Sequence, residues 1–242
     1  MESADPIVIK SNFLKACPEG IKSAIEMVNS IGSIKENGIP KLLPGINLIH
    51  GLIGENRDTF RLNYEFLKDI VDSGLLIRRI NIRQIKLSKN TLIQKSNRIS
   101  MKEEKKLDAG FRNYREKIRN EIDASLMQQI FPAGLVLTDL IVECHRGDWS
   151  IARPIGTYPI AVNIPRTIPV YSKISVFIIG YRERSLIGLP HPFYLKSASL
   201  QELKQIPGLS KKAGELFVNK TFPAEIFLQL PIFEKIKNSL IF

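Results

Sequence analysis

The first ninety residues alternate between helical and extended hydrophobic patterns. Apolar residues recur at helical spacing between Ile21 and Val28. The short apolar run Ile46-Asn47-Leu48-Ile49 is typical of a buried strand, and a second such run covers residues 79–85 after another helical stretch. The order helix, strand, helix, strand predicts a parallel sheet built from βα units.

The pattern changes character twice along the rest of the chain. Residues 91–132 are polar and charged at near-helical spacing, which predicts a helical linker. Residues 133–196 contain several short β-rich runs between turn signals, which predict a small β-barrel. Residues 197–242 are helical again, and no long-period repeat is apparent. With residues 1–90 as the first segment, the predicted fold is α/β, followed by a small β-barrel and a helical tail.

Charge and cysteine content narrow the classes of function. The chain has 35 Lys and Arg against 24 Asp and Glu, a net charge of +11, which favours nucleic acid or another polyanion as partner. No apolar run reaches the roughly 18 residues that a membrane span needs, and no secretory signal is visible. Cys17 and Cys144 cannot make a disulfide framework or a site of three thiolates. We therefore expect a cytoplasmic protein that holds no metal with its own residues.

The first motif relevant to ligand binding runs from Asn47 to Glu55, where a strand ends in a glycine turn. Glycines let the backbone turn sharply and let a flat ligand approach closely. In α/β sheets, ligands bind at the carboxyl ends of strands. An ordinary βα turn is the alternative interpretation. His50 lies beside the turn, and the sequence leaves open which side of the strand it faces.

The segment Pro44–Glu55 resembles the strand-and-turn motif of radical S-adenosylmethionine (radical SAM) enzymes. The helix around Asn63-Tyr64-Glu65-Phe66-Leu67 and the strand Arg78–Gln84 are similar to one archaeal branch of that family, which has a helix-hairpin-helix segment at its C-terminus. The resemblance implies that residues 1–90 form the second half of a radical SAM partial TIM-type barrel. It also implies that S-adenosylmethionine binds to Ile49, Gly51, Gly54, Glu55, Asn81 and Arg83.

One family feature is absent from the chain. Radical SAM enzymes hold a [4Fe–4S] cluster with a Cys-x3-Cys-x2-Cys loop, because thiolates are soft anionic ligands for iron. Since this sequence has no such loop, three interpretations stay open. The chain is one product of a split gene whose partner, an N-terminal radical SAM half, supplies the cluster; or it is a fragment; or it is a relic without radical chemistry. In none of them is it active alone.

Residues 133–196 resemble a divergent TRAM-type barrel, an OB-like module often attached to radical SAM enzymes that modify tRNA. Arginines interleaved with Trp149, Tyr158 and Tyr181 suit single-stranded or looped RNA. An alternative of equal weight is that the aromatic residues fill the barrel core and that the arginines are solvated. The predicted nucleic-acid contacts in the barrel are Arg153, Arg182 and Arg184.

The segment Leu200–Leu216 is similar to a helix-hairpin-helix. Its glycine turn would expose backbone N–H groups to a phosphate, and neighbouring lysines would add positive charge. The alternative is a packing element that caps the barrel. The predicted contacts here are Gly208, Ser210, Lys211 and Lys212.

The leading hypothesis is therefore a C-terminal subunit or fragment of a radical SAM enzyme. It would help to bind S-adenosylmethionine and a nucleic-acid substrate such as tRNA, with the cluster in a separate N-terminal half. A second hypothesis is a non-enzymatic nucleic-acid-binding protein that uses the barrel and the hairpin. The three histidines, His50, His145 and His191, are too widely spaced for a zinc pattern.

Overall fold

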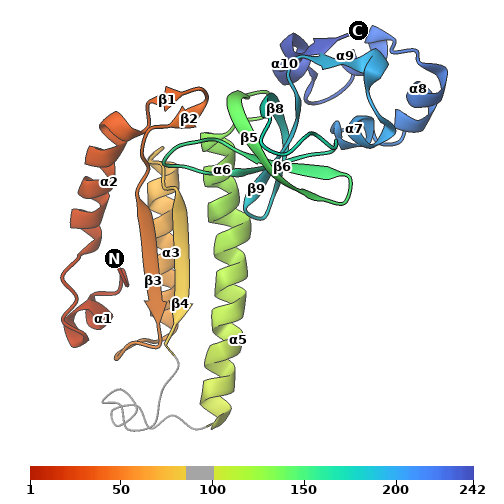
Figure 1. Ribbon diagram of the computed structural model, residues 1–242. Helices are drawn as coiled ribbons and strands as arrows, with labels where there is room; N and C mark the ends of the chain where they lie inside the picture. Colours follow the sequence, from red (N-terminus) through yellow and green to blue (C-terminus); the bar gives the residue numbers. More distant parts are fainter. Residues whose placement is uncertain (86–100) are drawn as a thin grey trace. The chain divides into compact units, whose positions relative to one another are not determined.

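The chain folds into two compact units (Figure 1). Unit 1 comprises residues 1–34 and 42–126, and unit 2 comprises residues 35–41 and 127–242. The computed structural model describes residues 1–85 and 101–242, with side chains of the second segment from residue 109. Residues 91–100 of the expected helical linker therefore lie outside the described residues.

The helices of unit 1 begin where the sequence supplies caps. The Asp5 carboxylate accepts a hydrogen bond from the Ile7 amide at 2.8 Å, and Asn56 forms a capping box with Thr59. None of the described helices is long and apolar enough to cross a membrane. The helical elements are α1 (Pro6–Ser11), α2 (Pro18–Gly32), α3 (Arg57–Asp72), α5 (Met101–Lys117), the π-helical η1 (Ile118–Asp123) and α6 (Ala124–Ile130), which leads into unit 2.

The sheet of unit 1 has two parallel strands, β3 (Gly45–His50) and β4 (Arg79–Gln84). The helix α3 connects them and lies behind both strands in Figure 1. Alternate residues of each strand point toward the core, where Ile46, Leu48 and Ile80 pack with apolar residues of α3.

The predicted half of a radical SAM partial TIM-type barrel is wrong. Such a half-barrel needs a series of parallel strands hydrogen-bonded side by side. Among the described residues of unit 1, β3 and β4 pair only with each other, and the other elements are helices. Hydrophobic periodicity can locate a strand, but it does not indicate how many other strands pair with it. The prediction therefore extended a single βαβ arrangement too far.

Unit 2 contains a closed five-stranded barrel. Its strands are β5 (Val136–Arg146), β6 (Trp149–Arg153), β7 (Ala161–Ile164), β8 (Lys173–Arg182) and β9 (Ser185–Pro190). They follow the order β5-β6-β7-β9-β8, and every neighbouring pair is antiparallel except β7 and β9. Gly188 allows the strands to close, because a Cβ there would lie 3.0 Å from Val162 and 3.2 Å from Val176.

A short hairpin from early in the chain completes unit 2. It consists of β1 (Lys35–Glu36) and β2 (Ile39–Pro40), which pair in antiparallel fashion. Its turn glycine, Gly38, packs against Val136 and Leu137 of the first barrel strand. The Lys35 ammonium donates to the carbonyl of Ile130.

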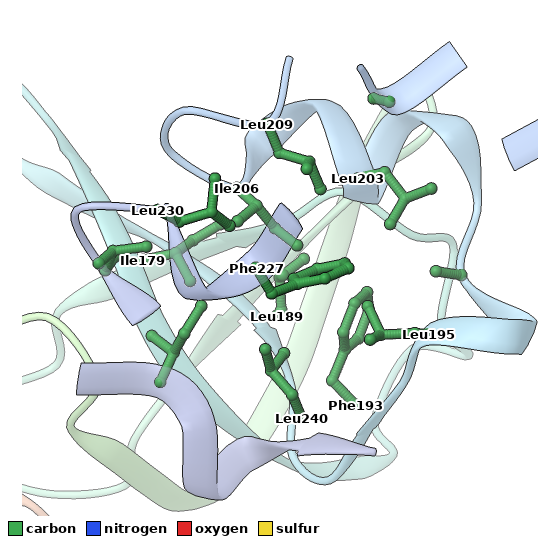
Figure 2. Packing of buried hydrophobic residues seen from close by; sticks show 14 of the residues in the cluster. Ile179, Leu189, Phe193, Leu195, Leu203, Ile206, Leu209, Phe227, Leu230 and Leu240 are labelled. Carbon is green, nitrogen blue, oxygen red and sulfur yellow. The ribbon is translucent and has the colours of Figure 1, made fainter. Parts of the chain in front are cut away.

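The helical tail shares one hydrophobic core with the barrel. Figure 2 shows Leu203, Phe227 and Leu230 of the tail packed with Ile179 and Leu189 of the barrel. The elements are β10 (Phe193–Tyr194), η2 (Leu195–Ser197), α7 (Leu200–Gln205), α8 (Ala213–Asn219), α9 (Ala224–Leu228), α10 (Phe233–Ile236), η3 (Lys237–Ser239) and β11 (Leu240–Ile241). Because β10 and β11 pair in parallel, the chain end returns to the segment that leaves the barrel.

The tail contains two turns at an offset of 24 residues, one after α7 and one after α9. We call residues 199–216 hairpin A and residues 223–240 hairpin B. The amides of Ile206 and Leu209 each donate to the carbonyl three residues earlier, and the amides of Leu230 and Phe233 do the same. Four identities relate the two hairpins: Gln205 with Gln229, Pro207 with Pro231, Lys211 with Lys235, and Leu216 with Leu240.

Candidate nucleic-acid interface

Two turns of the barrel meet through a cation–π contact. The guanidinium of Arg182, at the end of β8, lies 4.5 Å from the centroid of the Trp149 ring, at the start of β6. Arg146 and Arg184 are exposed in the same two turns. We call these four residues the barrel-turn site. It combines three cations with one half-buried indole.

The other aromatic residues of the barrel are structural. Tyr158 is buried, and its ring centroid lies 5.3 Å from that of Phe131. The Tyr181 hydroxyl donates to the Phe131 carbonyl at 2.8 Å, and burial raises the pKa of Tyr181. Trp149 is therefore the one aromatic residue, of the three considered in the sequence, that is available for stacking.

The predicted contact Arg153 is engaged within the barrel. Its Nε lies 2.8 Å from the Glu143 carboxylate, and its Nη1 donates to the Pro159 carbonyl at 3.1 Å. This arginine therefore links neighbouring barrel segments, whereas Arg182 and Arg184 remain exposed.

A pocket of about 530 Å³ opens beside the barrel-turn site, with Asp148 of the β5–β6 turn in its wall. Arg166 and the buried Glu202 also line it, as a two-point ion pair: Nε lies 2.7 Å from Oε1, and Nη2 donates to Oε2 at 3.0 Å. The amide and hydroxyl of Ser199 donate to the same Oε2 at 2.8 and 2.9 Å. This network attaches the end of β7 to the start of hairpin A.

The loop of hairpin A, residues 206–212, presents unused donors. Gly208 has a φ of +87°, and a Cβ there would lie 3.2 Å from Leu230 of hairpin B. Within the described part of the chain, the amides of Gly208, Ser210 and Lys211 meet no protein acceptor. The side chains of Lys211 and Lys212 are exposed. Three amides and two ammonium groups thus share one short loop.

Hairpin B lacks this arrangement. Ile232 occupies the position of Gly208 and is buried, with an exposed fraction of 7%. Lys235 occupies the position of Lys211 and is exposed. Hairpin B therefore supplies an internal comparison: a turn at the corresponding place with an exposed lysine, but with Ile232 at a φ of −93° where Gly208 has +87°.

In unit 1, the predicted S-adenosylmethionine residues fall into two groups. Ile49 is paired with Arg83, and Asn47 with Asn81, on the sheet face opposite Leu48. The side-chain Nδ2 of Asn81 donates to the side-chain Oδ1 of Asn47 at 2.8 Å. Ile49, Asn81 and Arg83 therefore share one face of the sheet.

The second group forms the turn after β3. Gly51 and Gly54 have φ values of +89° and +85°. The Glu55 side chain is only 7% exposed, and its Oε1 lies 2.7 Å from Nδ1 of His50. Its Oε2 accepts hydrogen bonds from the Gly51 and Leu52 amides. Glu55 is thus committed to holding the turn, and His50 faces the interior.

No motif in the sequence singles out Tyr114, which reaches this turn from α5. Its ring centroid lies 5.0 Å from that of His50. Among the described residues, neither its hydroxyl nor the His50 Nε2 has a hydrogen-bond partner, and both are buried. Burial raises the pKa of the Tyr114 phenol, and the Glu55 carboxylate raises it further.

We expect Tyr114→Phe to raise the free energy of unfolding by about 1 kcal/mol at neutral pH, because it removes a buried, unpaired hydroxyl. The native pKa lies above the unfolded value, so above about pH 10 the unfolded chain loses the phenol proton while the folded chain keeps it, and the stability of the unaltered protein falls as pH rises. The variant should therefore lose less stability above pH 10. Urea unfolding at several pH values measures both effects. A destabilised variant would show instead that the hydroxyl has a partner.

No group of three metal-binding side chains forms among the described residues. Cys17 and Cys144 are free and exposed. The [4Fe–4S] cluster therefore stays a prediction that depends on a partner chain.

Comparison with known proteins places the chain beside longer archaeal proteins. It is 35% identical, over 95% of its length, to a protein of Archaeoglobus fulgidus, and 40% identical, over 78% of its length, to a protein of Methanocaldococcus jannaschii. Both are named as uncharacterized proteins, and the matches cover 42% and 35% of them. The chain thus spans less than half the length of these relatives. No protein-family model matches it.

Proposed function

We propose that unit 2 binds single-stranded or looped RNA through the barrel-turn site and the loop of hairpin A. The observation that carries the proposal is the stacking of Arg182 on Trp149. It joins two turns of a small barrel into one surface that carries cations and a stacking ring.

The topology of the barrel supports this location. Five-stranded Greek-key barrels of the OB type bind oligonucleotides with the loops between strands 1 and 2 and between strands 4 and 5. In this barrel those loops are the β5–β6 and β8–β9 turns, which contain the barrel-turn site. Successive bases stack on aromatic rings and guanidinium planes, while exposed arginines such as Arg146 and Arg184 neutralise phosphates.

The loop of hairpin A supplies a second phosphate contact. Amides that lack a protein acceptor and lie in one short loop can donate to an anion, and the two lysines add charge beside them. Unit 2 has 15 Lys and Arg against 9 Asp and Glu, a net charge of +6. Electrostatic attraction therefore favours nucleic acid over acidic partners of lower charge density.

Binding of S-adenosylmethionine at Ile49, Asn81 and Arg83, with a cluster from a separate N-terminal half, remains a prediction from the radical SAM resemblance. The geometry favours it less, because Glu55 already serves His50 and the amides of the glycine turn. Binding of RNA by unit 2 needs neither the cluster nor a catalytic group in this chain.

Salt titration tests the proposal. Fluorescence anisotropy with a labelled single-stranded RNA of about 16 nucleotides should show an affinity that falls linearly on a log–log plot between about 0.05 and 0.2 M salt. The double variant Lys211→Ala/Lys212→Ala should reduce the magnitude of the slope by about 2 and weaken binding roughly 10- to 100-fold. The reason is that two phosphate contacts are lost.

The matched control is Lys235→Ala in hairpin B. This lysine has the corresponding place in hairpin B and is also exposed, but it lies beside Ile232 and not beside a glycine turn. We expect less than about a twofold change in affinity, because it makes no phosphate contact. An affinity of the unaltered protein that does not depend on salt would contradict the proposal, and equal losses for both lysine changes would remove hairpin A from it.

A further inference from the structure

The helix α2 has two apolar faces. Its inner face, with Ile25 and Gly32, is buried in unit 1. A second apolar series occurs on the opposite side at spacings of three, four and three residues. We call it the outer stripe: Ala24, Met27 and Ile31 of the helix, with Ile34 two residues beyond its end. Met27, Ile31 and Ile34 are 75%, 70% and 52% exposed.

A close backbone contact joins Leu42 to Gly32, on the inner face of α2. The Leu42 amide donates to the Gly32 carbonyl at 2.9 Å, and a Cβ at position 32 would lie 2.0 Å from the Leu42 carbonyl oxygen. Only glycine permits this approach, which holds Leu42, 51% exposed, at the end of α2. Helices that are apolar on two sides are normally buried between two layers. Among the described residues, none buries Met27 or Ile31.

We propose that the outer stripe binds an amphipathic helix from the part of the longer archaeal relatives that lies outside the match with this chain. Alternating spacings of three and four residues form the seam into which a second helix packs its side chains. The match covers only 42% and 35% of the relatives, so more than half of each has no counterpart in this chain.

The size of the stripe favours that occupant over a second copy of this chain. Stable association between separate proteins uses roughly 20 to 30 residues on each side, whereas the outer stripe supplies four. A segment linked covalently in the relatives has a high effective concentration and needs far less contact area. The proposal concerns unit 1, so it stands or falls independently of RNA binding by unit 2.

The first test uses the relative as it exists. Carbene footprinting with peptide mass spectrometry compares this chain with the full-length Archaeoglobus fulgidus protein. The residues aligned with Met27 and Ile31 should label strongly in this chain and at least about tenfold less in the relative, because a helix covers them there. Equal labelling in the two proteins would overturn the proposal.

The second test reconstitutes the contact from two chains. The Archaeoglobus fulgidus segment outside the match is co-expressed with this chain and recovered by a tag. Ile31→Lys should weaken capture at least about 30-fold, as for a central contact residue. The control Val218→Lys, at a residue of unit 2 that is 77% exposed, should capture normally.

Circular dichroism confirms that both variants fold. If the segments do not associate in trans, the footprint on the full-length relative alone decides. Sedimentation of this chain by itself tests the rival occupant: a dimer that Ile31→Lys dissociates would overturn the proposal in favour of a second copy.

Discussion

Replacing Trp149 with alanine is expected to weaken the binding of single-stranded RNA about 10- to 100-fold. The loss of one aromatic stacking partner costs about 1 to 3 kcal/mol per base. The indole is half-buried under the Arg182 guanidinium, so its removal also releases that arginine from a fixed orientation. Fluorescence anisotropy at constant salt measures the change, and thermal unfolding shows whether the barrel remains intact.

Two further variants make this prediction specific. Tyr171→Ala removes an aromatic residue of unit 2 that is 84% exposed but lies outside the barrel-turn site, and it should leave affinity within about twofold. Arg182→Ala and the double variant with Trp149→Ala should be non-additive, because the two side chains are in contact. Unchanged affinity of Trp149→Ala would refute the barrel-turn site as the RNA contact.

The second large effect concerns stability. Arg166→Ala should lower the free energy of unfolding by about 3 kcal/mol, because it leaves the fully buried Glu202 carboxylate without its cation. The two hydrogen bonds from Ser199 remain but do not neutralise the charge. Urea unfolding followed by circular dichroism measures the loss.

A neutral partner should rescue the variant. Adding Glu202→Gln to Arg166→Ala removes the buried charge while keeping an oxygen that accepts from Ser199, so most of the lost stability should return. Arg184→Ala, at an exposed arginine, should change stability by less than about 0.5 kcal/mol. If Arg166→Ala alone costs as little as that control, the carboxylate reaches water and the ion pair is not structural.

In unit 1, the hydrophobic pattern predicted the positions of the strands better than the arrangement of the sheet. The apolar run at Ile46–Ile49 coincides with β3, and the run at 79–85 with β4. Their parallel pairing through α3 follows from the connection between them. The extension to a half-barrel failed because the number of neighbouring strands depends on contacts that no local period encodes. The direction of His50 was open for the same reason: an apolar run lacks the polar alternation that orients a strand.

In unit 2, the sequence identified candidate residues by their type, but it did not indicate which other side chains surround them. Arg153 and Arg182 read alike in the sequence, yet one is paired with Glu143 and the other lies on Trp149. The correspondence between hairpins A and B is hard to see in the sequence, because equivalent core positions stay apolar while the residue type changes, as at Leu203 and Phe227. A search for hydrophobic register at an offset of 24 residues could have found it.

The short β1–β2 hairpin makes unit 2 discontinuous along the chain. During synthesis on the ribosome, residues 35–41 leave the exit tunnel about a hundred residues ahead of Val136 and Leu137, against which Gly38 packs. Unit 2 therefore cannot be completed by the contiguous sequence 127–242. A gene fragment that begins at Met127 would encode every barrel strand and still omit one part of the finished unit.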